Sequence, residues 1–151
     1  MACGLSSRKL QPLLHVRSPE MSEVPPPFVP GDFPSPTRYR RGGREVLWDE
    51  WRNVLVAATP EEVIRQKFVK HLHANLGVPA GRVSLEKAMN HFKRDARGRA
   101  DIIVWDPVGR PLFIVECKAP GVPLTDDVFD QASRYHEVAE PYGGVIALTN
   151  G

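Results

Sequence analysis

Cysteine is scarce in this sequence, with 2 residues among 151. Cys3 lies in a polar segment and Cys117 inside an apolar run, so a framework of disulfide bonds is excluded as the basis of the fold. Long apolar runs are missing as well. None approaches the roughly 18 residues of a membrane-spanning helix, and Leu13–Leu14 is too short for the core of a signal peptide. We therefore expect a cytoplasmic protein without a membrane segment.

A strong charge of one sign is also absent. The 20 Lys and Arg residues nearly balance the 18 Asp and Glu residues, and the net charge is +2. Total charge therefore does not identify a nucleic-acid-binding protein, and only its distribution along the chain can do so. The sequence lacks a Walker A loop and a dinucleotide-binding glycine motif, so any helicase motor would lie on another chain or is missing from this one. The histidines lack the spacing of a zinc site; they are His15, His71, His73, His91 and His136.

Residues 1–43 are rich in proline and show no hydrophobic period of a helix or a strand. They contain eight of the 15 prolines. Such a segment cannot bury enough apolar surface to offset the entropy lost on ordering, so we predict a disordered tail, followed by a folded domain at residues 44–151. A basic cluster lies at the end of this tail and is more typical of a solvated linker than of a phosphate contact. It consists of Arg38, Arg40, Arg41 and Arg44.

The first folded elements are predicted from short apolar runs and helix signals. Residues 46–48 and 54–56 are apolar and flank a polar stretch, which indicates a small hairpin. Thr59 followed by Pro60 and two acids has the pattern of a helix start, and Gly77 ends the helix. Its apolar face is formed by residues four apart in the sequence: Ile64, Phe68, Leu72 and Leu76.

Three strands, a second helix and a last strand follow. We predict them at 83–89, 100–105, 112–117, 125–140 and 144–149. A helix between the third and fourth strands implies a parallel crossover. The fold class is therefore α/β, with a mixed four-stranded sheet and αβββαβ order. Since the sequence ends at Gly151, directly after a strand, we expect either a fragment or a partner chain that covers an exposed apolar edge.

The hairpin between the second and third of these strands brings two acids opposite each other. If it closes symmetrically about its turn, Val104 pairs with Phe113. The same register pairs Asp101 with Glu116, and Lys118 lies on the same face as Glu116. Opposed carboxylates repel unless a cation lies between them, and Mg²⁺ prefers oxygen ligands. The Glu-Cys-Lys tripeptide alone is more typical of a solvated ion pair; with Asp101 in register, a cation site is an equally good interpretation.

These residues resemble the PD-(D/E)xK nucleases. More narrowly, the chain is similar to the N-terminal domain of type I restriction enzyme R subunits, in a stand-alone or truncated form. The similarity runs from about Trp48 to Gly151. The D…ExK pattern alone is not specific, but a set of four sequence blocks in the expected order is specific. The blocks are residues 59–66, Ala100–Asp101 with 115–120, residues 129–135 and residues 148–151.

The resemblance implies a restriction-endonuclease-like core with a site for Mg²⁺, or for Mn²⁺. The residues that it implies for metal binding and catalysis are Asp101, Glu116, the backbone carbonyl of Cys117, and Lys118. It also implies a glutamate on the first helix, and both Glu61 and Glu62 fit. We favour Glu61 for this catalytic role because a helical wheel places it on the buried side. Acids in a first turn are also expected simply from the helix dipole.

Gln131 and Tyr135 are spaced four residues apart on the stripe of the second helix that faces the sheet. They match a QxxxY motif found in some of these nucleases. The motif implies a catalytic role for both residues, as organisers of the site or of bound DNA. A core tyrosine with a neighbouring amide is the alternative interpretation.

Positive charge is concentrated just before Asp101. Residues 82–99 contain six Lys and Arg residues and two acids, an excess of four positive charges. Because a nuclease must neutralise phosphates beside its carboxylates, we expect this segment to contact DNA, although charged runs are more often solvated surface. The residues predicted to bind DNA are Lys93, Arg94, Arg97, Arg99 and, from the first helix, Arg65.

The sequence therefore predicts a metal-dependent DNA endonuclease that hydrolyses phosphodiester bonds in restriction–modification or a related defence. The alternative is a catalytically silent DNA-binding or assembly module of a restriction or helicase complex, in which the carboxylates are retained for structure. DNA is the expected partner in both cases, together with other restriction-system subunits or a helicase chain.

Overall fold

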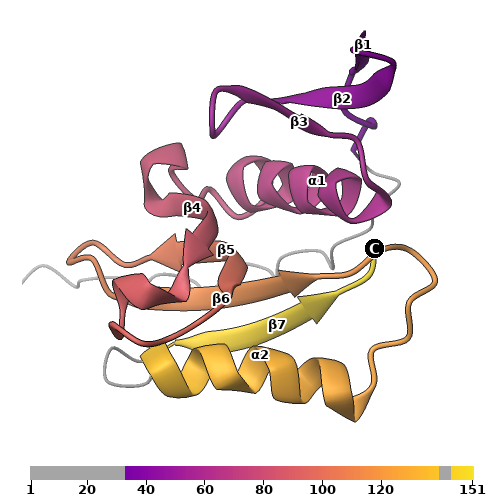
Figure 1. Ribbon diagram of the computed structural model, residues 1–151. Coiled ribbons are helices and arrows are strands. Elements are labelled where there is room, and N and C mark those ends of the chain that lie inside the picture. Colours follow the sequence, from indigo (N-terminus) through magenta and orange to yellow (C-terminus); the bar gives the residue numbers. More distant parts are fainter. Residues whose placement is uncertain (1–32, 140–143) are drawn as a thin grey trace, which may run out of the picture.

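The computed structural model describes residues 33–139 and 144–151. Figure 1 shows four layers: a three-stranded sheet, helix α1, a four-stranded sheet and helix α2. In chain order the elements are β1 (Arg38–Arg41), β2 (Arg44–Asp49), β3 (Val54–Ala57), α1 (Pro60–Ala74), η2 (Ala80–Arg82), β4 (Val83–Ala88), η3 (Met89–His91), β5 (Arg99–Trp105), β6 (Pro111–Cys117), α2 (Asp126–Ala139) and β7 (Val145–Thr149). No helix in this described part of the chain combines the length and apolar character needed to cross a membrane.

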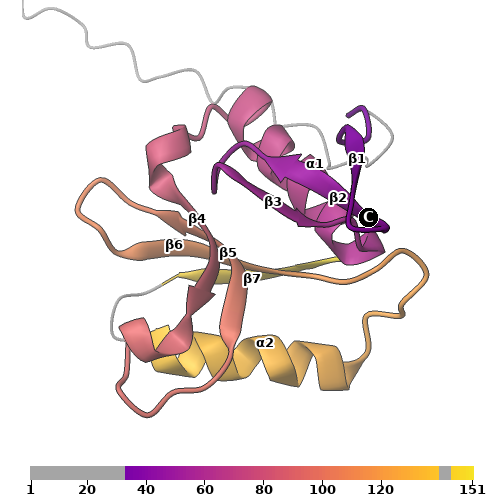
Figure 2. The same ribbon diagram turned by 45° about the horizontal axis from the view of Figure 1, so that its top comes forward.

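Strands β1 to β3 form an antiparallel sheet that lies over α1, as Figure 2 shows from above. The hairpin predicted at 46–48 and 54–56 is confirmed as β2 and β3. The basic cluster, in contrast, is not a linker: residues 38–41 form β1 and pair with β2. The turn between them is Gly42–Gly43, with φ values of 57° and 76°, which glycine adopts without strain and which suits a two-residue hairpin. Residues 1–32 of the predicted tail lie outside the described residues.

Helix α1 begins as its sequence predicts. Thr59 caps it by accepting a hydrogen bond on Oγ1 from the backbone N–H of Glu62 at 3.1 Å, and Pro60 occupies the first turn. Leu76 departs from the prediction, because the helix ends at Ala74 and Leu76 is 40% exposed. The buried apolar face is formed by Ile64, Val69 and Leu72.

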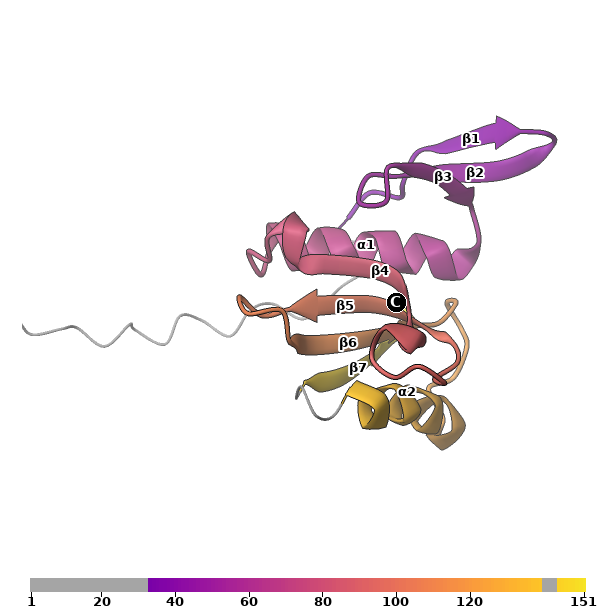
Figure 3. The ribbon, with the colours of Figure 1, turned by 60° about the vertical axis from the view of Figure 1, so that its left-hand side comes forward.

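The second sheet has the order β4-β5-β6-β7 and confirms the predicted mixed topology. The first three strands are antiparallel, and the crossover through α2 brings β7 parallel to β6. Val104 pairs with Phe113, which is the register that symmetric closure of the hairpin predicts. The edge-on view in Figure 3 places α1 on one face of this sheet and α2 on the other.

Each face of the second sheet has its own apolar core, because neighbouring residues of a strand point to opposite sides. Ile102 and Val115 pack with residues of α1. Ile103 and Ile114 pack in a second cluster that includes Ala139 of α2. The two cores fix the central strands β5 and β6 between the helices, and these are the strands that carry the predicted acids.

Candidate active site

Asp101 and Glu116 lie at the same end of the β5–β6 pair. Ile102 pairs with Val115, so the next position in this register places Asp101 across from Glu116. Both acids are buried, at 7% and 4% exposure. Oδ2 of Asp101 accepts a hydrogen bond from the backbone N–H of Cys117 at 2.7 Å, which holds the carboxylate against β6. The observed register thus brings together the two carboxylates that the sequence predicts.

Glu116 is held by two further predicted site residues. Its Oε1 accepts hydrogen bonds from Nζ of Lys118 and from Nε2 of Gln131, both at 2.9 Å. The side-chain oxygen of Gln131 in turn lies 3.3 Å from Nζ of Lys118, so the three side chains form a closed triangle. The other oxygen of Glu116, Oε2, is buried and has no hydrogen-bond partner among the described residues.

The charges in this cluster shift the titration of its members. Burial, with the added effect of Asp101, raises the pKa of Glu116 above its ordinary value. For Lys118, burial lowers the pKa, but the hydrogen bond to Glu116 and the negative charges of Glu116, Glu61 and Asp101 raise it more, so its net pKa lies above the ordinary value. Lys118 is therefore a permanent cation at neutral pH.

Glu116→Gln is expected to raise the melting temperature of the metal-free protein at neutral pH. An acid whose pKa is raised by folding destabilises the folded state at high pH, and this penalty disappears as the pH falls below the ordinary value of 4.5. The difference between variant and wild type should therefore shrink on acidification. Thermal unfolding followed by circular dichroism at a series of pH values measures it. A variant that melts at or below the wild-type temperature at neutral pH would contradict the expected direction.

Arg65 is a buried cation in the middle of the acids. It is 4% exposed, and its Nη2 lies 2.5 Å from Oδ1 of Asp101, 2.8 Å from Glu86 and 3.2 Å from Glu61, while its Nη1 pairs with Glu62. Burial lowers the pKa of Arg65, but the neighbouring carboxylates raise it by more than burial lowers it. The net pKa is above the ordinary value, so the guanidinium stays charged. This placement does not match the predicted role at DNA, because both terminal nitrogens bind carboxylates inside the protein.

Glu61 and Glu62 occupy different environments. The Glu61 side chain is 42% exposed, and burial followed by the charge of Asp101 raises its pKa, which places this acid at the rim of the site. Glu62 is buried and binds Arg52 at 2.6 Å as well as Arg65. The burial order predicted by the helical wheel is therefore wrong, because ion pairs draw Glu62 inward.

The network around Glu62 is the part of the site region that sequence reasoning missed. Buried Asp49, at the end of β2, pairs with Arg52 and accepts a hydrogen bond from Gln66 at 2.8 Å. Gln66 also donates to Glu62 at 2.8 Å, so the network joins the β2–β3 hairpin to α1. A fully buried glutamine on the inner face of a helix is the signal that could have indicated it, since buried amides need partners.

A cleft of about 490 Å³ lies beside Gln131. The predicted QxxxY pair lines it, with Arg134 on the same helix and Arg97 on the loop before β5. Tyr135 also packs against the core cluster beneath α2, so the core and cleft interpretations both describe it. Gly98 approaches the ring closely: a Cβ at this position, which has a φ of +92°, would lie 3.0 Å from the Tyr135 hydroxyl.

The remaining predicted DNA contacts are surface residues. Lys93, Arg94, Arg97 and Arg99 are exposed, on the segment that leads from η3 into β5. Arg99 is partly neutralised by Glu86 at 3.1 Å. Among these four, Arg97 is the one that lines the cleft with Gln131.

The donors at Asp101 and Glu116 are suitable for a hard cation. Within the described residues, no group of three or more His, Cys, Asp and Glu side chains is arranged to hold a metal ion. Two buried carboxylates nevertheless face each other here, and Oε2 of Glu116 lacks a partner. Mg²⁺ and Mn²⁺ accept a few carboxylate oxygens and complete their shells with water or phosphate. The chemistry of these donors suits such an ion, but both oxygens of Asp101 and Oε1 of Glu116 already accept hydrogen bonds, so a bound ion would have to share or displace those partners.

Comparison with known proteins adds a family to this geometry. The family model described as type I restriction enzyme R protein N terminus (HSDR_N) matches residues 60–151. The match begins with α1, includes the residues of the candidate site and leaves β1 to β3 outside. Neither the curated proteins nor the solved structures contain a significant match. Because the matched segment is more than half of the 151 residues, the chain belongs to the family of type I restriction enzyme R protein N termini.

Proposed function

We propose that this chain is a metal-dependent DNA endonuclease of the PD-(D/E)xK type, with a restriction-endonuclease-like core, acting in restriction–modification. The observation that carries the proposal is the convergence of Asp101, Glu116 and Lys118 at one end of the β5–β6 pair, where Gln131 joins Glu116 to Lys118 and the backbone N–H of Cys117 holds Asp101. Family membership supports the restriction–modification context. It does not by itself transfer an activity, which depends on the site.

In this proposal, Asp101, Glu116 and the backbone carbonyl of Cys117 hold Mg²⁺ or Mn²⁺. The bound ion supplies polarisation of the phosphoryl group and a lowered pKa of a coordinated water. Glu61 lies at the rim, within the electrostatic reach of Asp101 and Lys118. A partly exposed acid there can orient water molecules that approach the site.

Lys118 acts as a fixed positive charge rather than as a base. Its raised pKa keeps the amine protonated at neutral pH, so it cannot accept a proton from water there. Its ammonium group can instead stabilise the negative charge that develops on a phosphate. Gln131 is a positioning residue, because it binds both Lys118 and Glu116 and thereby fixes their separation.

One observation favours a second candidate, the catalytically silent DNA-binding or assembly module. The guanidinium of Arg65 already neutralises Asp101 at 2.5 Å, and it reaches three other acids. A buried arginine can replace a metal as the counterion of an acidic cluster. A metal can bind only if Asp101 and Glu116 retain oxygens free for it, such as Oε2 of Glu116.

The two candidates are separated by adding metal to the purified protein. The nuclease proposal predicts nicking of supercoiled plasmid with Mg²⁺ or Mn²⁺, none with EDTA, and a melting temperature that rises with metal concentration as expected for binding to the folded state. A protein that retains DNA in a gel shift, but neither cuts nor gains stability with metal, would assign the chain to the silent module.

The basic segment before β5 gives a separate prediction for duplex DNA. Arg94→Ala with Arg97→Ala should weaken binding and reduce the slope of log affinity against log salt by about 1.8, since each phosphate contact contributes about 0.9. Fluorescence anisotropy with a labelled duplex in EDTA measures the slope. Arg110→Ala, an exposed arginine on the β5–β6 turn paired with Asp106 at 2.7 Å, is the matched control. A slope that stays the same in the double variant would remove this segment from the DNA interface.

A further inference from the structure

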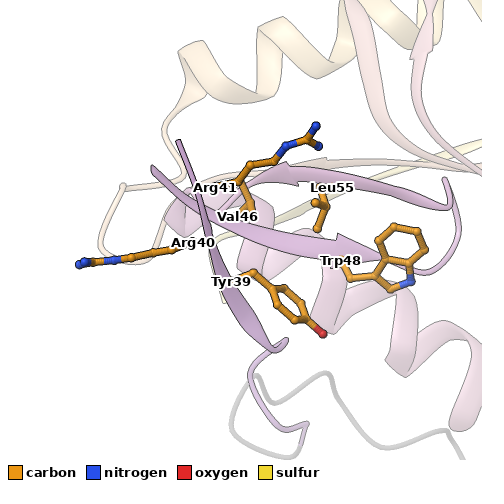
Figure 4. Close-up of a pocket in the computed structure, with 6 residues that line it drawn as sticks. All are labelled: Tyr39, Arg40, Arg41, Val46, Trp48 and Leu55. Carbon is orange, nitrogen blue, oxygen red and sulfur yellow. The ribbon is translucent and has the colours of Figure 1, made fainter. Parts of the chain in front are cut away.

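The outer face of the β1–β3 sheet carries a groove unrelated to the site above. Leu47 and Asp49 of β2 are buried beneath the sheet, so strand alternation places Val46 and Trp48 on the outer face. Tyr39 pairs with Val46, and Leu55 pairs with Trp48. These side chains surround a groove of about 390 Å³ (Figure 4), lined by Tyr39, Arg40, Arg41, Val46, Trp48 and Leu55.

Two aromatic rings stand exposed in this groove. Tyr39 is 50% exposed and Trp48 is 42% exposed. Figure 4 shows the two rings, Tyr39 from β1 and Trp48 from β2, among the side chains that line the groove. Large exposed rings are costly to hydrate, and rings on the open face of an antiparallel sheet are a platform on which unpaired bases can stack.

Positive charge surrounds the rings. β1 and the first residue of β2 contain Arg38, Arg40, Arg41 and Arg44, and the neighbouring acid Glu45 pairs with Arg38 at 2.7 Å. The other three arginines have no acidic partner among the described residues. Strand alternation places Arg41 and Arg44 on the same face as the rings, whereas Arg38, Arg40 and Glu45 extend from the other face. Two unpaired positive charges beside two rings suit a ligand with phosphates and accessible bases.

From this geometry we infer that the groove of Tyr39, Trp48 and Arg41 binds single-stranded DNA, with bases on the rings and phosphates on the arginines. In a duplex the base faces are stacked on each other and unavailable to the rings. A second copy of the chain is disfavoured, because a symmetric contact would bring two arginine-rich faces together. The choice of DNA over RNA rests on the proposed nuclease function, whereas the stacking and charge arguments do not.

Anisotropy of a labelled oligothymidine in EDTA tests the inference without any cleavage step. Tyr39→Ala and Trp48→Ala should each weaken binding about 5- to 150-fold, the range for loss of one base–ring stack. Trp48→Phe, which keeps a ring, should retain most of the affinity. Arg41→Gln should reduce the salt slope by about 0.7, the contribution of one phosphate on a single strand. Val54→Ala is the matched control, because Val54 is 45% exposed on the same sheet but pairs with Asp49, outside the groove.

Several results would overturn the inference. One is unchanged affinity in both alanine variants, provided that thermal melting shows them folded. Tighter binding of an RNA of matched sequence would also contradict it. So would duplex binding that is weakened by the two alanine variants as much as single-strand binding is, or self-association of the protein that these variants abolish. Since binding is measured without metal, loss of this inference leaves the cleavage proposal untouched, and a protein that never cuts plasmid can still bind the oligonucleotide.

Discussion

Asp101→Asn is expected to lower metal-dependent plasmid nicking at least about 100-fold, and Lys118→Ala to do the same, because under the proposed function Asp101 would hold the metal ion and Lys118 would stabilise the charge on the phosphate. Asn keeps the shape of Asp101 but has one acceptor oxygen, so it can keep the hydrogen bond from Cys117 only by losing the one from Arg65. Thermal melting at the assay temperature therefore has to show that the variant is folded before its rate is compared. Lys118 is only partly buried, with a side chain 17% exposed, and its truncation leaves a small cavity. Initial rates of conversion of supercoiled to open-circular plasmid measure both effects.

Two controls make the loss interpretable. Asp106→Asn removes a carboxylate from the same β5–β6 hairpin at its opposite end, where Asp106 accepts backbone hydrogen bonds that asparagine can also accept. Lys70→Ala removes a partly exposed lysine of α1 that pairs with Glu50 at 4.0 Å, away from the site. Both controls should cut at about the wild-type rate. If Asp101→Asn or Lys118→Ala nicks plasmid as fast as these controls, the proposed site is not the source of the activity.

The second large effect is on stability. Arg65→Leu should lower the free energy of unfolding by about 3 to 5 kcal/mol, the usual result of removing one partner from a buried ion network. The variant leaves Asp101 and Glu62 buried without this counterion, while Arg65 itself is 4% exposed. Urea unfolding followed by circular dichroism gives the difference. Arg94→Leu, at an exposed position, is the control and should change stability by less than about 0.5 kcal/mol.

The Arg65 result also bears on the acids themselves. If Arg65→Leu were as stable as the control, the carboxylates would have to be protonated or separated in solution, contrary to the ion pairs described above. Addition of Mg²⁺ offers a second measurement. A metal that binds Asp101 and Glu116 should restore part of the stability lost in Arg65→Leu, because the ion takes over the role of counterion.

The central geometry could be predicted from sequence because it depends on local rules. Counting residues on either side of the turn predicts that Val104 pairs with Phe113, and it does. The register nevertheless shifts by one residue next to the turn, where Trp105 pairs with Pro111, and the count does not predict this shift. Helix α1 has a local start signal in Thr59 and Pro60, and the structure shows both in use. The order of helices and strands follows from apolar periods and from the length of the crossover, neither of which needs long-range contacts.

The remaining features depend on contacts between segments that are distant in the sequence. Arg65 and Asp101 are 36 residues apart, and no local sequence pattern predicts that they form an ion pair. Glu62 is buried and Glu61 is exposed, the reverse of the predicted order, for the same reason. Arg52, which lies in the β2–β3 hairpin, pairs with Glu62 and holds it inside the protein. Strand β1 was missed because an arginine-rich segment with exposed side chains has no hydrophobic period to detect.

The network of Asp49, Arg52, Glu62 and Gln66 has a consequence for where this protein can be divided. The family match begins at residue 60, yet Glu62 and Gln66 of α1 rely on partners from the hairpin before it. A protein trimmed to the matched segment would expose these buried groups and release Glu62 from Arg52, altering the counterion balance at Arg65 and, through it, at Asp101. The family match and the contacts that support the site thus begin at different residues, and the β1–β3 sheet supplies side chains on which α1 depends.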